Sequence, residues 1–296
     1  MKSQVVERII KSAQPIINKM TLESQRSRQT AFFRMKPLPK GMEYTAVDDF
    51  AITSEWVVPE NADKDKIIFY THGGGYGMGD LVSSRALIAP IAKKCGMKAF
   101  SFEYRLAPES PFPAALEDAV EAYEYLLECG YRPENIVILG ESAGGGLVFS
   151  TMLFLKHHGK PLPKCAVAIS PWADLTETSH SYVKNGDKDP LLSAECLEKL
   201  AEAYIGDDSP LNPLISPAYA VFDESYPPVL IQVGDKEVLY DDSILMRNAL
   251  VNGGVNVELE IYRDMWHVFH IWQIEQSALA IQYIFDFISK YMKPCE

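Results

Sequence analysis

Apolar and polar positions alternate along the chain in two rhythms from Lys66 onward, as short β-branched runs and as longer segments with helical spacing. Such alternation is typical of a parallel sheet whose faces are covered by helices. The apolar runs predict strands at 67–71, 98–102, 135–139, 164–169, 228–233 and 255–262. The helical spacing predicts helices at 81–94, 113–129, 143–157, 241–252 and about 273–292.

Two segments do not share this alternation. Residues 1 to about 40 are helical and amphipathic, with apolar side chains such as Val5, Ile9 and Ile16 at helical spacing. Residues from about 174 to 217 are polar, helical in patches and interrupted by prolines. We therefore expect a single α/β domain over residues 1–296, with a mostly parallel central sheet flanked by helices and a helical cap formed by these two segments.

The composition is that of an ordinary globular chain of 296 residues, with 47% hydrophobic and 23% charged residues, so a core can form without metals or disulfides. The net charge of -12 argues against a nucleic-acid partner, because binding phosphates requires clustered Lys and Arg. No stretch approaches the roughly 20 apolar residues of a membrane span, and the N-terminal segment lacks the features of a signal peptide.

The cysteines indicate the compartment. They are odd in number, far apart and never in a C-x-x-C pair: Cys95, Cys129, Cys165, Cys196 and Cys295. This pattern is typical of reduced thiols rather than of a disulfide framework, and it predicts a cytoplasmic protein.

Residues Gly140 to Gly144 (GESAG) follow one predicted strand and precede a helix. In this context G-x-S-x-G forms a nucleophile elbow, a sharp turn that strains the serine and exposes its hydroxyl. The helix that begins there directs free backbone N–H groups at an oxyanion formed nearby. Ser142 is therefore a candidate nucleophile, and a plain glycine-rich turn is the alternative interpretation.

Residues His72 to Gly75 (HGGG) follow another predicted strand and match the HGGG form of an oxyanion-hole loop. Three glycines allow bare backbone N–H groups to approach a substrate oxygen where negative charge develops. The alternative is a phosphate-binding loop, but no Gly-Lys-Ser/Thr follows and no G-x-G-x-x-G frame fits. Both motifs in this order, each behind its own strand, indicate a serine hydrolase.

Among the histidines, His267 best fits a general base. It follows the last predicted strand and so lies at the carboxyl edge of the sheet, as does Ser142. His270, three residues later, is its rival. The other histidines are expected to brace the oxyanion loop, to end a helix without sharing a face, or to lie in the cap: His72, the pair His157 and His158, and His180.

The loop after the predicted strand 228–233 offers the acid of a triad. Its four carboxylates are Asp235, Glu237, Asp241 and Asp242. The acid must accept the imidazole N–H and stabilise the imidazolium, which either carboxylate type can do. All four satisfy the chain order serine, acid, histidine, so the residues alone leave this choice open.

These motifs resemble the hormone-sensitive-lipase family of α/β-hydrolase esterases, which has HGGG and a GxSAGG elbow, here Gly140 to Gly145. Three further segments are similar to that family: 104–109 (YRLAPE), 111–118 (PFPAALED) and 170–175 (SPWADL). The resemblance covers nearly everything after Asp65. It implies the α/β-hydrolase fold, a cap of N-terminal helices plus an inserted segment, and a homodimer as in many members.

The resemblance also implies roles for individual residues. Ser142 would be the nucleophile and His267 the base. The backbone N–H groups of three residues would form the oxyanion hole: Gly74, Gly75 and Ala143. The family commonly reads Asp-Pro-Leu-x-Asp, which aligns with residues 237–241 (EVLYD) and places Glu237 at the acid position, with Asp235 as the alternative.

Motifs and resemblance together predict a carboxylesterase that hydrolyses short- to medium-chain acyl esters of small molecules through an acyl-enzyme, without metal or cofactor. Four aromatic residues are candidates to line the pocket under the cap: Phe32, Phe33, Tyr182 and Tyr204. An amidase or deacetylase with the same triad is one alternative. A ligand-binding receptor, like the gibberellin receptors that resemble this family but have lost the histidine, is another, and the presence of His267 argues against it.

Overall fold

One mixed sheet runs through the molecule in the computed structural model, which describes residues 2–17 and 19–292 and omits the side chain of Pro15. Residues 1, 18 and 293–296, and with them Cys295, lie outside the described residues. The eight strands of the described residues are β1 (Met42–Ala46), β2 (Ser54–Pro59), β3 (Asp63–Thr71), β4 (Met97–Phe102), β5 (Ile136–Glu141), β6 (Cys165–Ile169), β7 (Val229–Gly234) and β8 (Val257–Tyr262). They lie in the order β1-β2-β4-β3-β5-β6-β7-β8.

The predicted, mostly parallel sheet is confirmed: among the described strands, β2 alone runs opposite to the rest, so its pairings with β1 and β4 are antiparallel. The sequence pattern did not predict β1 and β2. In β2 the apolar alternation is broken by Glu55, which is 2% exposed and whose carboxylate accepts three hydrogen bonds from the Arg85 guanidinium. β3 begins at Asp63, earlier than the predicted Ile67. Its first four residues are charged, so the apolar pattern did not include them.

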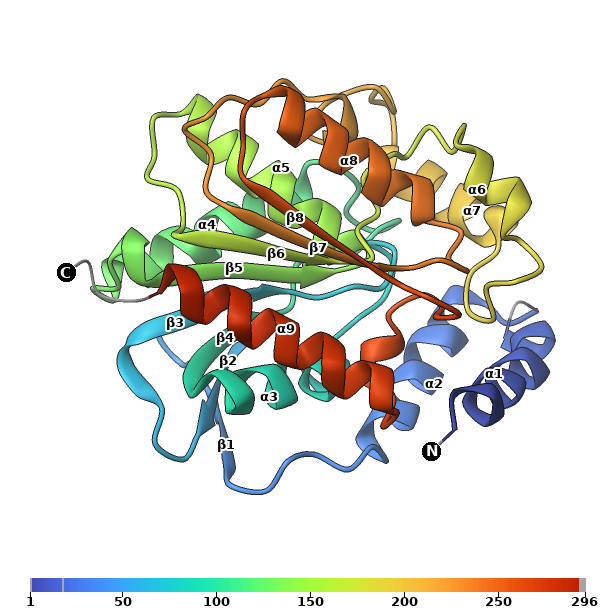
Figure 1. Cartoon of the computed structure of the whole chain (residues 1–296), viewed down its shortest axis with the longest axis horizontal. Helices are drawn as coiled ribbons and strands as arrows, with labels where there is room; N and C mark the ends of the chain where they lie inside the picture. The colour runs from blue at the N-terminus through green and yellow to red at the C-terminus, as the bar shows by residue number, and fades with distance from the viewer. Residues whose placement is uncertain (1, 18, 293–296) are drawn as a thin grey trace.

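Helices cover both faces of the sheet (Figure 1). One face packs against α3 (Leu81–Cys95) and α9 (Glu275–Tyr291), and the other against α4 (Ala114–Glu128), α5 (Ala143–His157) and α8 (Tyr240–Asn252). Alternate residues of β3 enter the two cores: Ile67 and Phe69 on one side, Ile68 and Tyr70 on the other. Burial of both faces explains the uninterrupted apolar runs that predicted these strands.

Four helices gather at the end of the sheet where the parallel strands finish (Figure 1): α1 (Ser3–Ile17), α2 (Leu22–Arg34), α6 (His180–Lys184) and α7 (Ala194–Ile205). They belong to the two segments expected to form a cap. Short 3-10 turns complete the fold at Pro133–Asn135, Pro217–Tyr219 and Phe269–Ile271.

The first two helices are tied to three separate loops of the body. Arg26 of α2 donates to the carbonyl of Gly77 at 2.7 Å. Lys36 donates to the carbonyl of Ile271 at 3.0 Å, and Glu7 of α1 forms an ion pair with Lys236 at 3.4 Å. These contacts reach the loops after β3, β8 and β7, respectively.

Within the described ranges, no helix is both long enough and apolar enough to cross a bilayer. The cysteines at positions 95, 129, 165 and 196 are free thiols.

Candidate active site

Ser142 occupies the turn between β5 and α5 with φ 56° and ψ -124°, a strained conformation for a residue with a side chain. Two hydrogen bonds hold it there: its N–H donates to Ile169 and its carbonyl accepts from Trp172, both at 2.9 Å. A Cβ on Gly144 would overlap the carbonyl of Thr71. Glycine at this position therefore lets α5 start directly against β3 and leaves the serine at the tip of the turn.

Two consecutive hydrogen bonds join three side chains from three different loops. Ser142 Oγ lies 2.9 Å from His267 Nε2, and His267 Nδ1 lies 3.0 Å from Glu237 Oε2. With Nδ1 protonated toward the carboxylate, Nε2 keeps the lone pair that accepts the serine O–H. The exposed fractions are 8% for Ser142, 5% for His267 and 0% for Glu237. This geometry lets the hydroxyl transfer its proton to an imidazole whose positive charge a neighbouring carboxylate stabilises.

The Glu237 carboxylate is fixed by further donors. Its Oε1 accepts from Ser170 Oγ at 2.8 Å and from the N–H of Gly234 at 2.5 Å. Ser170 Oγ in turn accepts from the N–H of Val268 at 3.3 Å, beside His267. One hydroxyl therefore connects the loop of the acid with the loop of the histidine. Sequence reasoning used Ser170 only as the start of a family-like segment and did not predict this contact.

The other three carboxylates of the acid loop have different partners. Asp235 is exposed and accepts a backbone N–H from the turn after β8 at 2.7 Å. Asp241 accepts a backbone N–H from the first turn of α6 at 2.8 Å. Asp242 accepts two backbone N–H groups after β6, and burial raises its pKa. Among the four carboxylates, only Glu237 forms a hydrogen bond with His267 in the described part of the chain.

Free backbone donors lie beside the serine. None of the N–H groups of Gly74, Gly75 and Ala143 donates to another described residue. Gly74 and Gly75 have φ values of 120° and 62°, which glycine adopts without strain. Ala143 is the first residue of α5, so its N–H carries the positive end of the helix dipole. Such donors are suited to bind a developing oxyanion.

Glu141, the variable residue before Ser142 in the motif, orients the oxyanion loop. Its Oε1 accepts from the N–H of Gly73 at 2.8 Å. Burial raises the pKa of Glu141 to about 7, while the hydrogen bond from Gly73 opposes that rise. This role of Glu141 was not predicted, although the charged residue between Gly140 and Ser142 is visible in the sequence.

The other histidines have partners other than Ser142. His270 Nε2 lies 3.0 Å from Gln232 Oε1, and burial lowers the pKa of His270 to about 3. His72 Nδ1 lies 2.8 Å from the carbonyl of Gly73, and burial lowers the pKa of His72 to about 4. Both rings are therefore neutral at pH 7. The remaining three lie at the end of α5 and at the exposed start of α6: His157, His158 and His180.

The segment between α6 and α7 forms hydrogen bonds with the backbone of the acid loop. Asn185 Nδ2 donates to the carbonyl of Glu237 at 2.8 Å and to that of Asp235 at 3.2 Å. Asp189 Oδ2 accepts from the N–H of Val238 at 3.1 Å, and burial raises the pKa of Asp189 to about 6. Asn185 and Asp189 are each 2% exposed. Neither was predicted, because their partners lie about fifty residues further along the chain.

Helix α7 lies against the oxyanion loop. A Cβ built on Gly75 would lie 2.5 Å from Leu200 Cδ1, and one on Gly77 would lie 2.9 Å from Leu200 Cδ2. The Leu200 side chain thus occupies the space that any larger residue in this loop would need.

Of the four aromatic residues considered for the pocket lining, two pack inside the protein. Tyr204 stacks on Tyr76 with ring centroids 3.6 Å apart, and Tyr182 accepts a hydrogen bond from a buried indole at 3.1 Å. Phe32 and Phe33 contact each other edge to face at 5.3 Å, and Phe32 is 38% exposed.

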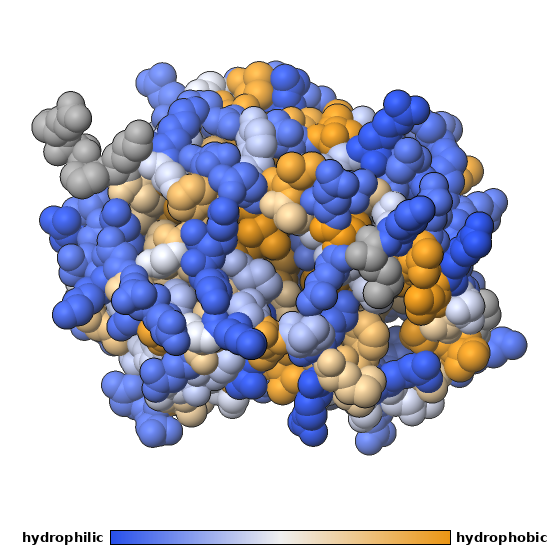
Figure 2. Space-filling view, turned by 60° about the horizontal axis from the view of Figure 1, so that its bottom comes forward, coloured by the Kyte–Doolittle hydropathy of each residue, from blue (hydrophilic) through white to orange (hydrophobic). Residues whose placement is uncertain are grey.

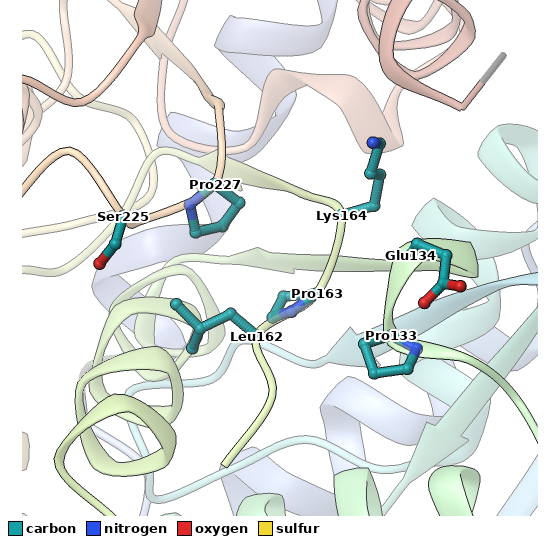
Figure 3. Close-up of a pocket in the computed structure, with 7 residues that line it drawn as sticks. All are labelled: Pro133, Glu134, Leu162, Pro163, Lys164, Ser225 and Pro227. Carbon is teal, nitrogen blue, oxygen red and sulfur yellow. The ribbon is translucent and has the colours of Figure 1, made fainter. Parts of the chain in front are cut away.

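A separate surface depression of about 340 Å³ lies at the opposite end of the sheet (Figure 3). Its lining residues precede β5, β6 and β7: Pro133, Glu134, Leu162, Pro163, Lys164, Ser225 and Pro227. The hydroxyl of Ser225 and the carboxylate of Glu134 lie on opposite sides of it (Figure 3). This depression therefore does not offer the paired nucleophile and base found around Ser142.

Comparison with known proteins places the chain in a family. Residues 68–271 match the model of a family described as having the alpha/beta hydrolase fold. An acetyl-hydrolase of Streptomyces hygroscopicus is 41% identical to the chain, with 74% of this chain and 72% of that protein covered. An esterase of Acinetobacter venetianus is 36% identical, with 75% of each covered.

Solved structures agree over the whole chain. A hormone-sensitive lipase from a metagenome library has a TM-score of 0.94 and 34% identity, and the match covers 99% of both chains. An esterase that was soaked with p-nitrophenyl butyrate has a TM-score of 0.91 and 33% identity, again over 99% of both. The chain therefore belongs to the α/β-hydrolase fold family, among its hormone-sensitive-lipase-type esterases.

Proposed function

We propose that Ser142, His267 and Glu237 form the catalytic triad of this carboxylic ester hydrolase. The observation that carries the proposal is the pair of hydrogen bonds, 2.9 Å and 3.0 Å long, which joins the serine hydroxyl to the imidazole and the imidazole to a buried carboxylate. Both relatives named above, an acetyl-hydrolase and an esterase, support an ester as the substrate.

In the first half of the reaction, Ser142 Oγ attacks the ester carbonyl carbon while its proton moves to His267 Nε2. Glu237 stabilises the imidazolium. The carbonyl oxygen becomes an oxyanion, and the free N–H groups of Gly74, Gly75 and Ala143 donate hydrogen bonds to it. When the tetrahedral intermediate collapses, the alcohol leaves with the proton from His267 and the acyl group stays on Ser142.

In the second half, a water molecule gives one proton to His267 as its oxygen attacks the acyl carbon. A second oxyanion forms at the same N–H groups. Its collapse breaks the bond to Ser142 Oγ, which takes back the proton from His267. The products are one carboxylic acid and one alcohol, and the enzyme returns to its starting state.

We propose short to medium acyl chains as the preferred substrates. Leu200 of α7 occupies the space next to Gly75, which supports a short acyl site beside the oxyanion donors. The soaking of a similar esterase with p-nitrophenyl butyrate agrees with this size. In this proposal the segments 1–40 and 174–217 act as the cap that restricts the acyl group.

A cytoplasmic location and a homodimer are further proposals. The four cysteines of the described residues are free thiols, which supports a reducing compartment. β8 is an edge strand, and the apolar side chains of Ile261 on β8 and Leu279 on α9 are 46% and 58% exposed. An unpaired edge next to exposed apolar side chains supports pairing with a second copy there.

The triad is tested by comparing Ser142→Ala with Ser150→Ala, a buried serine that donates to its own helix at Gly146. With p-nitrophenyl butyrate, we expect Ser142→Ala to lower kcat by about 10⁴-fold or more, because the nucleophile is lost. Ser150→Ala should retain activity within a few-fold. A fluorophosphonate probe should add one label to wild type and none to Ser142→Ala by intact mass; activity in Ser142→Ala would disprove the assignment.

A further inference from the structure

Helix α1 has a wider apolar face than the body of the protein covers. At 3.6 residues per turn, Val6 and Ile10 point to one side, and Val5, Ile9 and Ile16 fall within about 40° of one another on an adjacent side. The first pair is 1% and 7% exposed, whereas the second row is 47%, 55% and 58% exposed. Figure 2 shows such apolar side chains among polar ones on the right of its view, the side where α1 lies in Figure 1.

The same segment carries a charge opposite to that of the rest of the chain. Residues 1–40 contain nine Lys and Arg and two Glu, a net charge of +7, so residues 41–296 carry -19. Five exposed basic residues here form no ion pair with any described residue: Lys2, Arg8, Lys19, Arg28 and Arg34. Arg8 lies on α1 itself, Lys2 and Lys19 lie next to its ends, and Arg28 and Arg34 lie on α2. An aliphatic row on a helix within such a basic segment is typical of a helix that lies in the interface of an anionic membrane.

The inner side of α1 contacts the loop of the histidine. Val6 and Ile10 belong to the same apolar cluster as Trp266 and Phe269, the residues that flank the His267 region. The outer row on α1 therefore lies at the end of the sheet that holds Ser142. A surface bound to that row would face the catalytic end of the molecule.

We propose that the outer face of α1 docks on an anionic lipid surface, with Val5, Ile9 and Ile16 inserted among the acyl chains and the basic side chains against the headgroups. The negative body would be repelled by such a surface, so the molecule binds with one orientation. Docking brings the catalytic end of the sheet to a phase in which apolar esters concentrate. That benefit rests on the proposed function, whereas the binding itself does not.

The test is flotation of the full chain with vesicles of phosphatidylcholine alone or mixed with an equal part of phosphatidylglycerol. The triple variant Val5→Ser/Ile9→Ser/Ile16→Ser removes the row. Its matched control is Val221→Ser/Leu245→Ser/Val251→Ser, which alters three exposed aliphatic residues elsewhere, 91%, 37% and 42% exposed. Circular dichroism melting verifies that both variants fold.

Wild type should bind the anionic vesicles at least about tenfold more tightly than the neutral ones, and about 1 M salt should remove that difference. The row variant should lose about tenfold or more in binding, and the control should stay within twofold. Repeating flotation with Ser142→Ala separates binding from catalysis, because this result does not depend on turnover.

Absence of wild-type binding to anionic vesicles would overturn the proposal. Equal loss of binding in the row variant and in the control would overturn it as well. If wild type sediments as a dimer that the row variant dissociates, without vesicle binding by either, a second copy of the chain covers this face and the lipid proposal is wrong.

Discussion

The body and the cap segments of this protein contribute to the site by different kinds of contact. In the body, Ser142 and Glu237 follow two strands of one sheet, and their positions are set by the strands and by buried hydrogen bonds. The cap segments reach the same loops through single side chains, such as Asn185 on the acid loop and Leu200 on the oxyanion loop. Under the proposed function, the body would supply the reacting groups, and the cap segments would set their position and the space for the acyl group.

The largest effect should come from the acid in the body. Glu237→Gln keeps the shape but no longer stabilises the imidazolium and can hold the wrong tautomer of His267, so kcat should fall by about 10³-fold or more. Asp235→Asn, two residues away and exposed, is the matched control and should stay within a few-fold. Steady-state kinetics on a p-nitrophenyl ester measures both, and a greater loss in Asp235→Asn would transfer the role of the acid to that residue.

The next largest effect is on the pH dependence of stability, where a buried histidine of the body is compared with an exposed histidine of the cap. The folded pKa of His270 is lowered to about 3 by burial, so below pH 6.5 the unfolded chain binds a proton that the folded chain does not. Stability therefore falls as pH falls from about 6.5 toward 3, by roughly 1.4 kcal/mol per pH unit, or tenfold in the unfolding equilibrium. His270→Gln should remove this pH dependence. The free energy of unfolding of the variant should therefore rise relative to that of wild type as pH falls.

Urea unfolding of wild type and His270→Gln at about pH 6, 5 and 4 measures this difference directly. Other titrating groups, including Glu141 and Asp189, are common to both proteins and cancel. His180→Gln, at an exposed position in the cap, is the control for replacing a histidine by glutamine. A constant difference between wild type and His270→Gln across these pH values would contradict the prediction.

A contact from the cap to the body should have a smaller effect. Asn185→Ala removes the two hydrogen bonds to the carbonyls of Glu237 and Asp235, so the acid is held less well and kcat should fall by about tenfold. KM should change little, because Asn185 acts on the acid and not on the substrate. Asn212→Ala, whose amide oxygen accepts a local turn N–H, is the control in the same segment. An increase in KM alone would mean that Asn185 contacts the substrate instead.

The smallest effect is expected from the space under α7. Leu200→Ala opens room beside Gly75, so the rate ratio of a p-nitrophenyl decanoate to a butyrate should rise by a few-fold, up to about tenfold. Leu211→Ala in the same segment, at an exposed position, should leave the ratio unchanged. An unchanged ratio in Leu200→Ala would show that this side chain does not limit the acyl group.

Local patterns predicted much of the fold because most strands are buried on both faces and therefore read as apolar runs. They failed at β2, where Glu55 is buried only because Arg85, thirty residues later, neutralises it. An ion pair between distant residues leaves no periodic signal at either position. The same limit explains why β1, an edge strand with polar positions, was not predicted.

The residues of the site also fall into those that a local motif predicts and those that depend on distant contacts. Ser142 and the glycines of the oxyanion loop are placed by short motifs, whose geometry is local. Among the four carboxylates, Glu237 is distinguished by its hydrogen bond to His267, and it is held in place by Ser170, which lies 67 residues away in sequence. The residues missed altogether, Glu141, Asn185 and Asp189, act on loops that only the folded sheet brings near them.

The contacts of the N-terminal segment with the loops after β3, β7 and β8 have a consequence for the inactivation of the enzyme. If heat or a protease detaches this segment, its contacts with all three loops are lost together, and Trp266 and Phe269 lose the apolar contacts of Val6 and Ile10. We therefore expect activity to be lost before the sheet unfolds.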